Sequence, residues 1–245
     1  MNLTAKKIFL VATLAVSGSA FAQTKAPEPD YTLGFTAGAV TDYRYRGISQ
    51  SRLKPALQGS IDFSHKSGFY VGTWASTIKW VKDAGGDAGA EVDLYGGYKG
   101  TAGPIGYDVG VLRYLYPGSK LGLNPDTTEL YGAVTFGPGT LKYSQATTNT
   151  FGFANSKNSY YLDLSGNFEL GDGWSVVPHI GYQKIKNNSG YSYTDYAVTL
   201  GKDLGSGLSA SAALIATDAN KNLYVTPAGK FTGKTMLVLG AKYAF

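Results

Sequence analysis

The chain has 245 residues, no cysteine and a formal net charge of +5, and only 16% of its residues are charged. The lack of cysteine excludes a disulfide-stapled scaffold, and so small a basic balance, without a cluster of lysines and arginines, gives no reason to expect nucleic-acid binding. The 33 glycines and 19 tyrosines favour short strands, tight turns and aromatic girdles over a helical protein.

The first 22 residues have the pattern of a secretory signal peptide. A basic start precedes an apolar run over residues 8–16, and the segment ends on small residues at Ala22. The apolar run is shorter than the roughly 20 residues that a transmembrane helix needs. We therefore expect export with cleavage after Ala22, a short periplasmic leader over residues 23–30, and a single β-barrel domain over residues 31–245.

After the leader, the sequence divides into about twelve segments in which polar and apolar residues alternate, each near the roughly 9–11 residues of a tilted transmembrane strand. The expected strands span residues 31–43, 55–64, 69–80, 90–98, 105–114, 127–136, 140–147, 159–170, 174–184, 193–202, 208–216 and 235–245. Two of these strands are less regular than the others. Phe69–Trp80 carries aromatic residues on both faces, and Pro178 predicts a bulge because proline cannot donate to a sheet ladder.

Tight connectors alternate with longer ones along the whole chain. Turns rich in Gly, Pro and Asp, such as 137–139 and 171–173, supply the dihedral angles of a hairpin. Between them lie longer connectors, such as 44–54 and 217–233. Short periplasmic turns and longer external loops are typical of outer-membrane barrels. An even number of strands then places both termini on the periplasmic side.

The last segment, 235–245, alternates to its tip and ends on the aromatic Phe245. A soluble β-sandwich would also alternate, with its apolar row inside. The signal pattern, the terminal aromatic residue, the turn asymmetry and the aromatic residues near strand ends favour a barrel whose apolar row faces lipid. We therefore expect an all-β, antiparallel, up-and-down transmembrane barrel of about twelve strands. The expected aromatic girdles contain Tyr31, Tyr43, Tyr98, Tyr107, Trp174, Tyr182, Tyr196, Tyr243 and Phe245.

Three stretches at the start of the barrel carry a family resemblance. They are TDYRYRGISQS at 41–51, PALQG at 55–59 and GFYVGTWAS at 68–76. These stretches resemble the start of the TorF family of proteobacterial proteins, which are classed as outer-membrane porins. The resemblance is best over the N-terminal third, and the remainder fits by length and strand spacing. The resemblance implies an outer-membrane barrel of Gram-negative bacteria and a porin function, and it brings no catalytic residues with it.

The polar row of the strands supplies the candidate site residues. If the first strand keeps its register, Asp42, Arg44 and Arg46 share the inward face, where arginine can bind carboxylates bidentately. They predict either a charged constriction that filters solutes by sign or a structural ion-pair network at the barrel mouth. The second interpretation is favoured because buried charges are usually paired. The residues expected to line the lumen are Asp42, Arg44, Arg46, Asp62, Glu91, Asp93, Asp108, Glu129, Lys142, Asp163, His179 and Lys242.

Neither catalysis nor a metal or cofactor is expected from these residues. His179 is the inward histidine, and Ser175 on the same face lies four residues away, more than about 10 Å along a strand. That separation is too long for a Ser–His pair. The other histidine, His65, lies beside a turn, so histidines and cysteines form no ligand cluster.

The sequence therefore predicts an outer-membrane channel for passive diffusion of small polar solutes or ions. Acidic residues outnumber basic ones in the luminal row, so we expect a mild preference for cations. The alternative is a non-conducting barrel whose external loops bind a surface partner or lipopolysaccharide. The expected partners are outer-membrane lipid and lipopolysaccharide, small solutes, and the barrel-assembly machinery, which would act on the C-terminal strand ending at Phe245.

Overall fold

The computed structural model describes residues 29–245, so the expected signal peptide and most of the leader lie outside the described residues. The wall strands are β1 (Tyr31–Val40), β4 (Ala56–His65), β5 (Phe69–Thr77), β6 (Ala90–Ala102), β7 (Ile105–Leu115), β8 (Thr127–Phe136), β9 (Gly139–Ala146), β10 (Tyr160–Gly166), β11 (Phe168–Gly171), β12 (Trp174–Lys184), β13 (Tyr193–Gly205), β14 (Leu208–Thr217) and β15 (Met236–Ala244). Between them lie the short strands β2 (Arg44–Tyr45) and β3 (Ile48–Ser49), the helical turn α1 (Trp80–Asp83) and the 3-10 turn η1 (Ser189–Tyr191).

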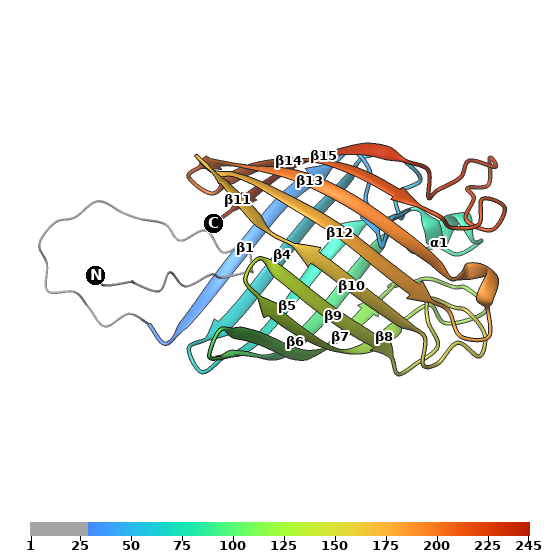
Figure 1. Ribbon diagram of the computed structural model, residues 1–245. Coiled ribbons are helices and arrows are strands. Elements are labelled where there is room, and N and C mark those ends of the chain that lie inside the picture. Colours follow the sequence, from blue (N-terminus) through green and yellow to red (C-terminus); the bar gives the residue numbers. More distant parts are fainter. Residues whose placement is uncertain (1–28) are drawn as a thin grey trace, which may run out of the picture.

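The wall strands form one antiparallel sheet that curls into a closed barrel (Figure 1). The first strand, β1, pairs with the last, β15, and β10 closes the remaining gap by pairing with β12. β11 follows β10 after Asn167 and pairs with the same neighbour, β12. β10 and β11 therefore act as one strand, and the expected antiparallel barrel of twelve strands is confirmed.

The connectors divide between the two ends of the barrel as expected. Tight turns, such as Gly103-Pro104 and Ser206-Gly207, join strands at one end, which we call the short-turn end. Longer connectors, such as residues 41–55 and 218–235, lie at the opposite, long-loop end. In Figure 1, the C-terminus and the start of β1 lie together at the short-turn end.

The outer surface of the barrel is apolar, because the alternation of side chains holds along every wall strand. On β7, for example, Ile105, Val109 and Val111 are 45%, 53% and 41% exposed, whereas Tyr114 on the opposite face is buried. Exposed large apolar side chains come from all the wall strands. Together they form a surface, here called the apolar belt, that is far larger than the patches a soluble monomer exposes.

Most of the expected girdle residues lie on this outer surface, but Tyr43 does not. Tyr31, Tyr182 and Tyr243 are exposed, whereas Tyr43 is buried and its hydroxyl donates to Glu91 Oε1 at 2.7 Å. The prediction for Tyr43 is wrong because β1 ends at Val40, so the strand alternation no longer decides where residue 43 points.

The two irregular strands also become clear in the structure. β5 turns Phe69 and Val71 outward, and it ends at Thr77, so Trp80 belongs to α1 and not to the strand. The bulge expected at Pro178 is wrong. β12 keeps one continuous register with β13 through Pro178. Its pairing on the other side breaks at residues 166 and 167, opposite Pro178 and Val177, and resumes in the same register.

Tyrosines on the inward face lie across glycines of neighbouring strands. A Cβ atom on Gly97 or Gly110 would lie 2.6 Å or 2.5 Å from a tyrosine hydroxyl, so only glycine leaves room for the ring. Three cross-strand pairs are of this kind: Tyr70–Gly97, Tyr95–Gly72 and Tyr131–Gly110. The rings therefore lie along the wall, which leaves space in the lumen.

A charge placed on the apolar belt is expected to destabilise the barrel. We expect Val109→Arg to lower the free energy of unfolding in lipid by about 2–4 kcal/mol, the cost of arginine near the middle of a bilayer. Urea titration of the protein in vesicles, followed by tryptophan fluorescence, measures the loss. The matched control is Ser211→Arg, which places the same charge at an exposed position on the inward face of β14 and should leave the unfolding midpoint unchanged.

Candidate functional site

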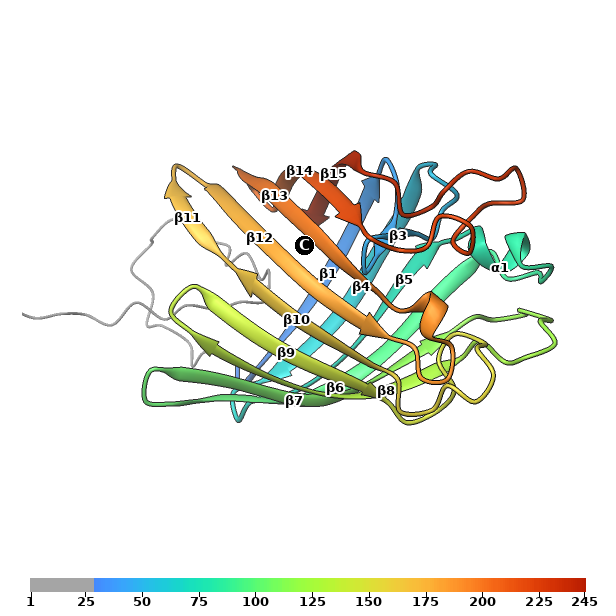
Figure 2. The same cartoon turned by 45° about the vertical axis from the view of Figure 1, so that its right-hand side comes forward.

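The first long loop, residues 41–55, turns back into the barrel. In its segment Arg44–Ser49, here called the inner hairpin, β2 pairs with β3, and Figure 2 shows β3 inside the ring of wall strands. The two turn residues, Arg46 and Gly47, have φ angles of 46° and 78°. This is the geometry of a two-residue type I′ hairpin. Arginine rarely adopts a positive φ, so the contacts of Arg46 must hold it there.

Asp42 closes the base of the inner hairpin. Its carboxylate is 1% exposed and accepts hydrogen bonds from Ser49 Oγ at 2.5 Å and Ser51 Oγ at 3.0 Å. It also accepts a bond from Arg44 Nε at 2.5 Å, and Arg44 Nη1 donates to the carbonyl of Gly47 at 2.8 Å. One buried carboxylate therefore binds both strands of the hairpin, and its charge is compensated by Arg44.

Arg46 at the hairpin tip reaches the far wall of the barrel. Its guanidinium donates to Glu129 Oε2 on β8 at 2.7 Å and to Gln183 Oε1 on β12 at 2.5 Å, and it lies 4.2 Å from the ring centre of Tyr161 on β10. Burial by itself lowers the pKa of Arg46, but the charge of Glu129 outweighs it and raises the pKa well above its ordinary value. Arg46 therefore carries its charge inside the barrel at every physiological pH.

Aromatic and apolar residues fill the space around the hairpin. Tyr45 packs edge-on against Tyr114 with ring centres 5.5 Å apart, and the two hydroxyl groups are 2.8 Å apart. On the other side, Ile48 forms a buried cluster with Tyr193 and Ala219. The inner hairpin therefore narrows the lumen near the long-loop end, where its side chains pack like those of a protein core.

A second network on the wall is joined to the hairpin tip. His179 lies between two carboxylates, with Nδ1 2.9 Å from Asp163 Oδ2 and Nε2 2.8 Å from Asp195 Oδ1. The hydroxyl of Tyr161 donates to the other oxygen of Asp195 at 2.9 Å, and the ring of Tyr161 lies under Arg46. Both nitrogens of His179 face carboxylates, so neither is placed to activate a serine.

A third network follows the wall from β4 to β8. The hydroxyl of Tyr70 donates to Asp108 Oδ1 at 2.7 Å and also bonds the hydroxyl of Tyr131. The hydroxyl of Tyr95 donates to Asp62. These tyrosines are only partly buried, so this part of the lumen surface consists of aromatic hydroxyl groups and carboxylates.

The other expected luminal residues face inward with different surroundings. Glu91 is buried under Tyr43, and Asp93 beside it has one carboxylate oxygen, Oδ1, without a hydrogen-bond partner among the described residues. The ammonium of Lys142 lies 4.1 Å from the centre of the Tyr131 ring. Lys242 lies on β15 opposite Gly38, and within the described part of the chain it belongs to none of the three networks.

The expected register of Arg44 and Arg46 is wrong, although both side chains do face the interior. β1 stops at Val40, so their placement follows from the hairpin and not from a continued strand. Sequence reasoning left out Tyr161 and Gln183, which bind the arginine at the tip. Both lie on the inward rows of their strands, so the alternation of the sequence already indicated that they face the lumen.

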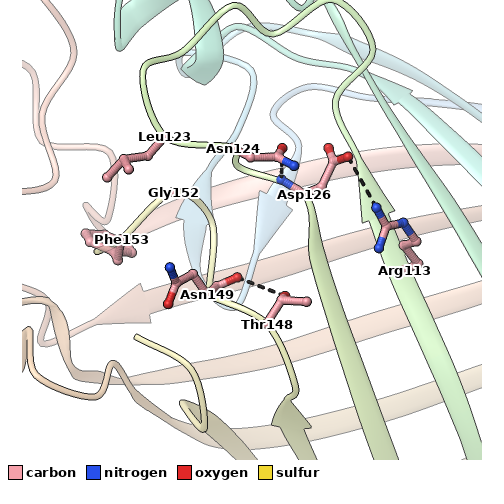
Figure 3. A pocket seen from close by; sticks show the side chains of 8 residues that line it. All are labelled: Arg113, Leu123, Asn124, Asp126, Thr148, Asn149, Gly152 and Phe153. Atoms are coloured by element: carbon pink, nitrogen blue, oxygen red, sulfur yellow. Dashed lines mark hydrogen bonds and ion pairs between the residues drawn. The ribbon is translucent and has the colours of Figure 1, made fainter. Parts of the chain in front are cut away.

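A small pocket opens at the long-loop end between residues 116–126 and 147–159 (Figure 3). Its volume is about 190 Å³. Two of its lining residues form an ion pair, with Arg113 Nη2 3.6 Å from Asp126 Oδ2. The hydroxyl of Thr148 donates to the carbonyl of Asn149 at 3.0 Å. The acidic and basic groups of the pocket are already paired, so we assign no chemistry to it.

Within residues 29–245, no group of three or more His, Cys, Asp or Glu side chains is arranged to hold a metal ion. The same part of the chain contains no helix whose length and apolar character would let it cross a membrane.

Comparison with known proteins agrees with the barrel. A family model described as "Bacterial protein of unknown function (Gcw_chp)" matches residues 24–245, and no curated protein matches the chain. Among solved structures, the KdgM porin aligns with a TM-score of 0.57 at 9% identity over 86% of this chain and 99% of that chain. The NanC porin aligns with a TM-score of 0.56 at 10% identity over 87% and 99%. Identities this low show the fold alone, and the TorF name stays a prediction.

Removal of the arginine at the hairpin tip is expected to destabilise the barrel. Arg46→Met leaves Glu129 buried without its cation, which costs about 3–5 kcal/mol of unfolding free energy. Urea unfolding in detergent micelles measures the change. The matched control is Arg52→Met, which breaks the exposed ion pair with Asp83 and should produce no measurable change. An unfolding free energy of Arg46→Met equal to that of the unmodified protein would contradict the dependence of Glu129 on Arg46.

Proposed function

The chain belongs to the Gcw_chp family of bacterial proteins of unknown function, and we propose that it is an outer-membrane, porin-like channel. The apolar belt supports insertion into lipid, with short turns in the periplasm and long loops outside. The observation that carries the proposal is the polar lumen inside a closed sheet. Side chains such as Ser211 face inward and remain exposed. Small polar solutes or ions would diffuse passively along this surface.

We infer that the inner hairpin narrows the lumen to a constriction, while its arginines form the structural ion-pair network that the sequence favoured. It crosses from β1 to the opposite wall, so a solute that enters from the long-loop end must pass beside it. Arg46, Glu129 and Tyr161 contact one another and are largely withdrawn from solvent, so they hold the hairpin across the lumen. The passage beside the hairpin then selects solutes mainly by size.

One observation favours the alternative, a non-conducting barrel whose loops bind a surface partner or lipopolysaccharide. Around the hairpin, residues such as Tyr45, Ile48 and Tyr193 pack closely and are largely withdrawn from solvent. A barrel of about twelve strands is narrower than the open 16–18-stranded porins, so a well-packed hairpin is able to close it.

Single-channel recording in planar bilayers separates the two functions. We expect small, steady current steps from the unmodified protein, and larger steps when residues 44–49 are replaced by two glycines, because the constriction is then removed. A matched control replaces residues 227–230, which are exposed at the tip of another external loop, by two glycines and should leave the step size unchanged.

The outcomes of this recording are distinct. Current steps from the unmodified protein support the channel. Steps from the hairpin-deleted protein alone support the non-conducting alternative. Absence of steps from both proteins, with insertion confirmed by heat-modifiable gel mobility, would exclude a channel of either kind.

Ion selectivity is expected to depend on the luminal carboxylates. Asp42 and Glu129 are compensated by arginine, whereas Asp62 and Asp108 accept hydrogen bonds from hydroxyl groups and form no ion pair among the described residues. We expect the unmodified protein to prefer cations mildly. The double variant Asp62→Asn, Asp108→Asn should lose most of this preference. Reversal potentials in a salt gradient measure it.

The matched control for selectivity neutralises Glu169 and Asp172, two exposed acids at the short-turn end. These changes should alter the reversal potential less than the luminal pair. A clear anion preference of the unmodified protein would contradict the expectation.

A further inference from the structure

Two neighbouring loops at the long-loop end carry lysines and no acidic residue. They span residues 147–159 and 185–192. Hydrogen bonds join them, because the backbone N–H of Lys186 donates to Ser159 Oγ at 3.0 Å and Asn187 Nδ2 donates to the carbonyl of Asn155 at 2.8 Å. The two loops therefore present their charges from one connected platform.

Unlike Arg52 and Lys120 on other loops, the lysines of this platform are not paired with an acid among the described residues. Lys157 and Lys186 are exposed, and Lys184 lies at the end of β12 on the outward row. Within residues 29–245 none of the three takes part in an ion pair. On other loops, Arg52 pairs with Asp83 and Lys120 pairs with Asp87. The three lysines, here called the lysine patch, therefore keep uncompensated positive charge.

A cluster of outward tyrosines lies directly below the lysine patch. Tyr160 lies between Tyr143 and Tyr182, with ring centres 5.6 Å and 6.2 Å away. Its cross-strand partner on β12 is Lys184, and the next outward pair toward the middle of the barrel is Leu162–Tyr182. From the middle outward, the surface changes from aliphatic to aromatic to cationic. Tyrosine occupies the membrane interface, so the lysines lie at the depth of lipid headgroups.

We propose that Lys157, Lys184 and Lys186 bind the phosphate groups of a glycolipid, lipopolysaccharide, in the outer leaflet. This inference depends on the proposed outer-membrane location with the long loops outside. Lysine is a compact cation with three donors, and its aliphatic stem can lie along apolar surface while the ammonium reaches a phosphate. The two joined loops contain no acidic residue, and the three ammonium groups lie above one tyrosine cluster. This arrangement suits a ligand that has acyl chains and an anionic headgroup.

Lipid binding to the barrel in nanodiscs of neutral phosphatidylcholine tests the proposal. The probes are fluorescent lipid A with both phosphates and the same lipid A with its phosphates removed. We expect the phosphorylated form to bind the unmodified protein, and the variant Lys157→Gln, Lys184→Gln, Lys186→Gln to bind roughly 100-fold more weakly, since each basic residue near an anionic surface contributes about fivefold. The dephosphorylated form should bind both proteins equally weakly.

The matched control is Lys221→Gln, Lys230→Gln, Lys234→Gln, which removes three exposed lysines from another loop. It should retain the affinity of the unmodified protein. Equal weakening by both variants would show a general charge effect and overturn the proposal, as would equal binding of the two lipids. Competition by millimolar inorganic phosphate would show a site for the free anion and would also overturn it.

Failure of this inference can be told apart from failure of the proposed function. The same variants are inserted into neutral bilayers and their current steps are recorded. Normal steps with unchanged lipid affinity would reject the lysine patch and leave the channel intact. Weakened lipid affinity without current steps from any protein would support the lysine patch and point to the non-conducting barrel.

Discussion

The arrangement inside the barrel depends on the ion pair between Arg46 and Glu129, because a guanidinium enclosed by protein must have partners. Glu129 lies on the far wall, so the first loop has to fold inward to satisfy the charge at its tip. The same guanidinium lies on Tyr161, whose hydroxyl bonds Asp195, and Asp195 in turn binds His179. One buried cation therefore connects the loop, the wall and the luminal network, and a change at any of these points affects the others.

The wall could be predicted from the sequence because the face of each side chain follows from that of its neighbour. The expected strands 127–136 and 174–184 coincide with β8 and β12. The path of residues 41–55 could not be predicted in this way. Its contacts join distant positions, such as Arg46 and a carboxylate 83 residues later, and no local pattern identifies them. The error for Tyr43 has the same origin, since alternation has no meaning beyond the end of a strand.

The amino-acid composition has a structural cause beyond turns and girdles. Inward tyrosines need a cross-strand glycine under the ring, as Tyr70 and Gly97 show. This pairing accounts for glycines in the middle of strands, where they otherwise weaken a sheet. It also lets the hydroxyl groups reach carboxylates such as Asp108 along the wall. The position of glycine on the neighbouring strand therefore decides where an inward tyrosine can lie flat against the wall.

The inner hairpin is also tied to the end of the chain. Arg44 Nη1 donates to the carbonyl of Lys234 at 3.1 Å, and the backbone N–H of Ser49 donates to the carbonyl of Thr232 at 3.0 Å. Both acceptors belong to the segment that leads into β15, the strand that seals the seam with β1. The hairpin can make these two bonds only when that segment is in place. Closure of the seam and full anchoring of the hairpin are therefore linked.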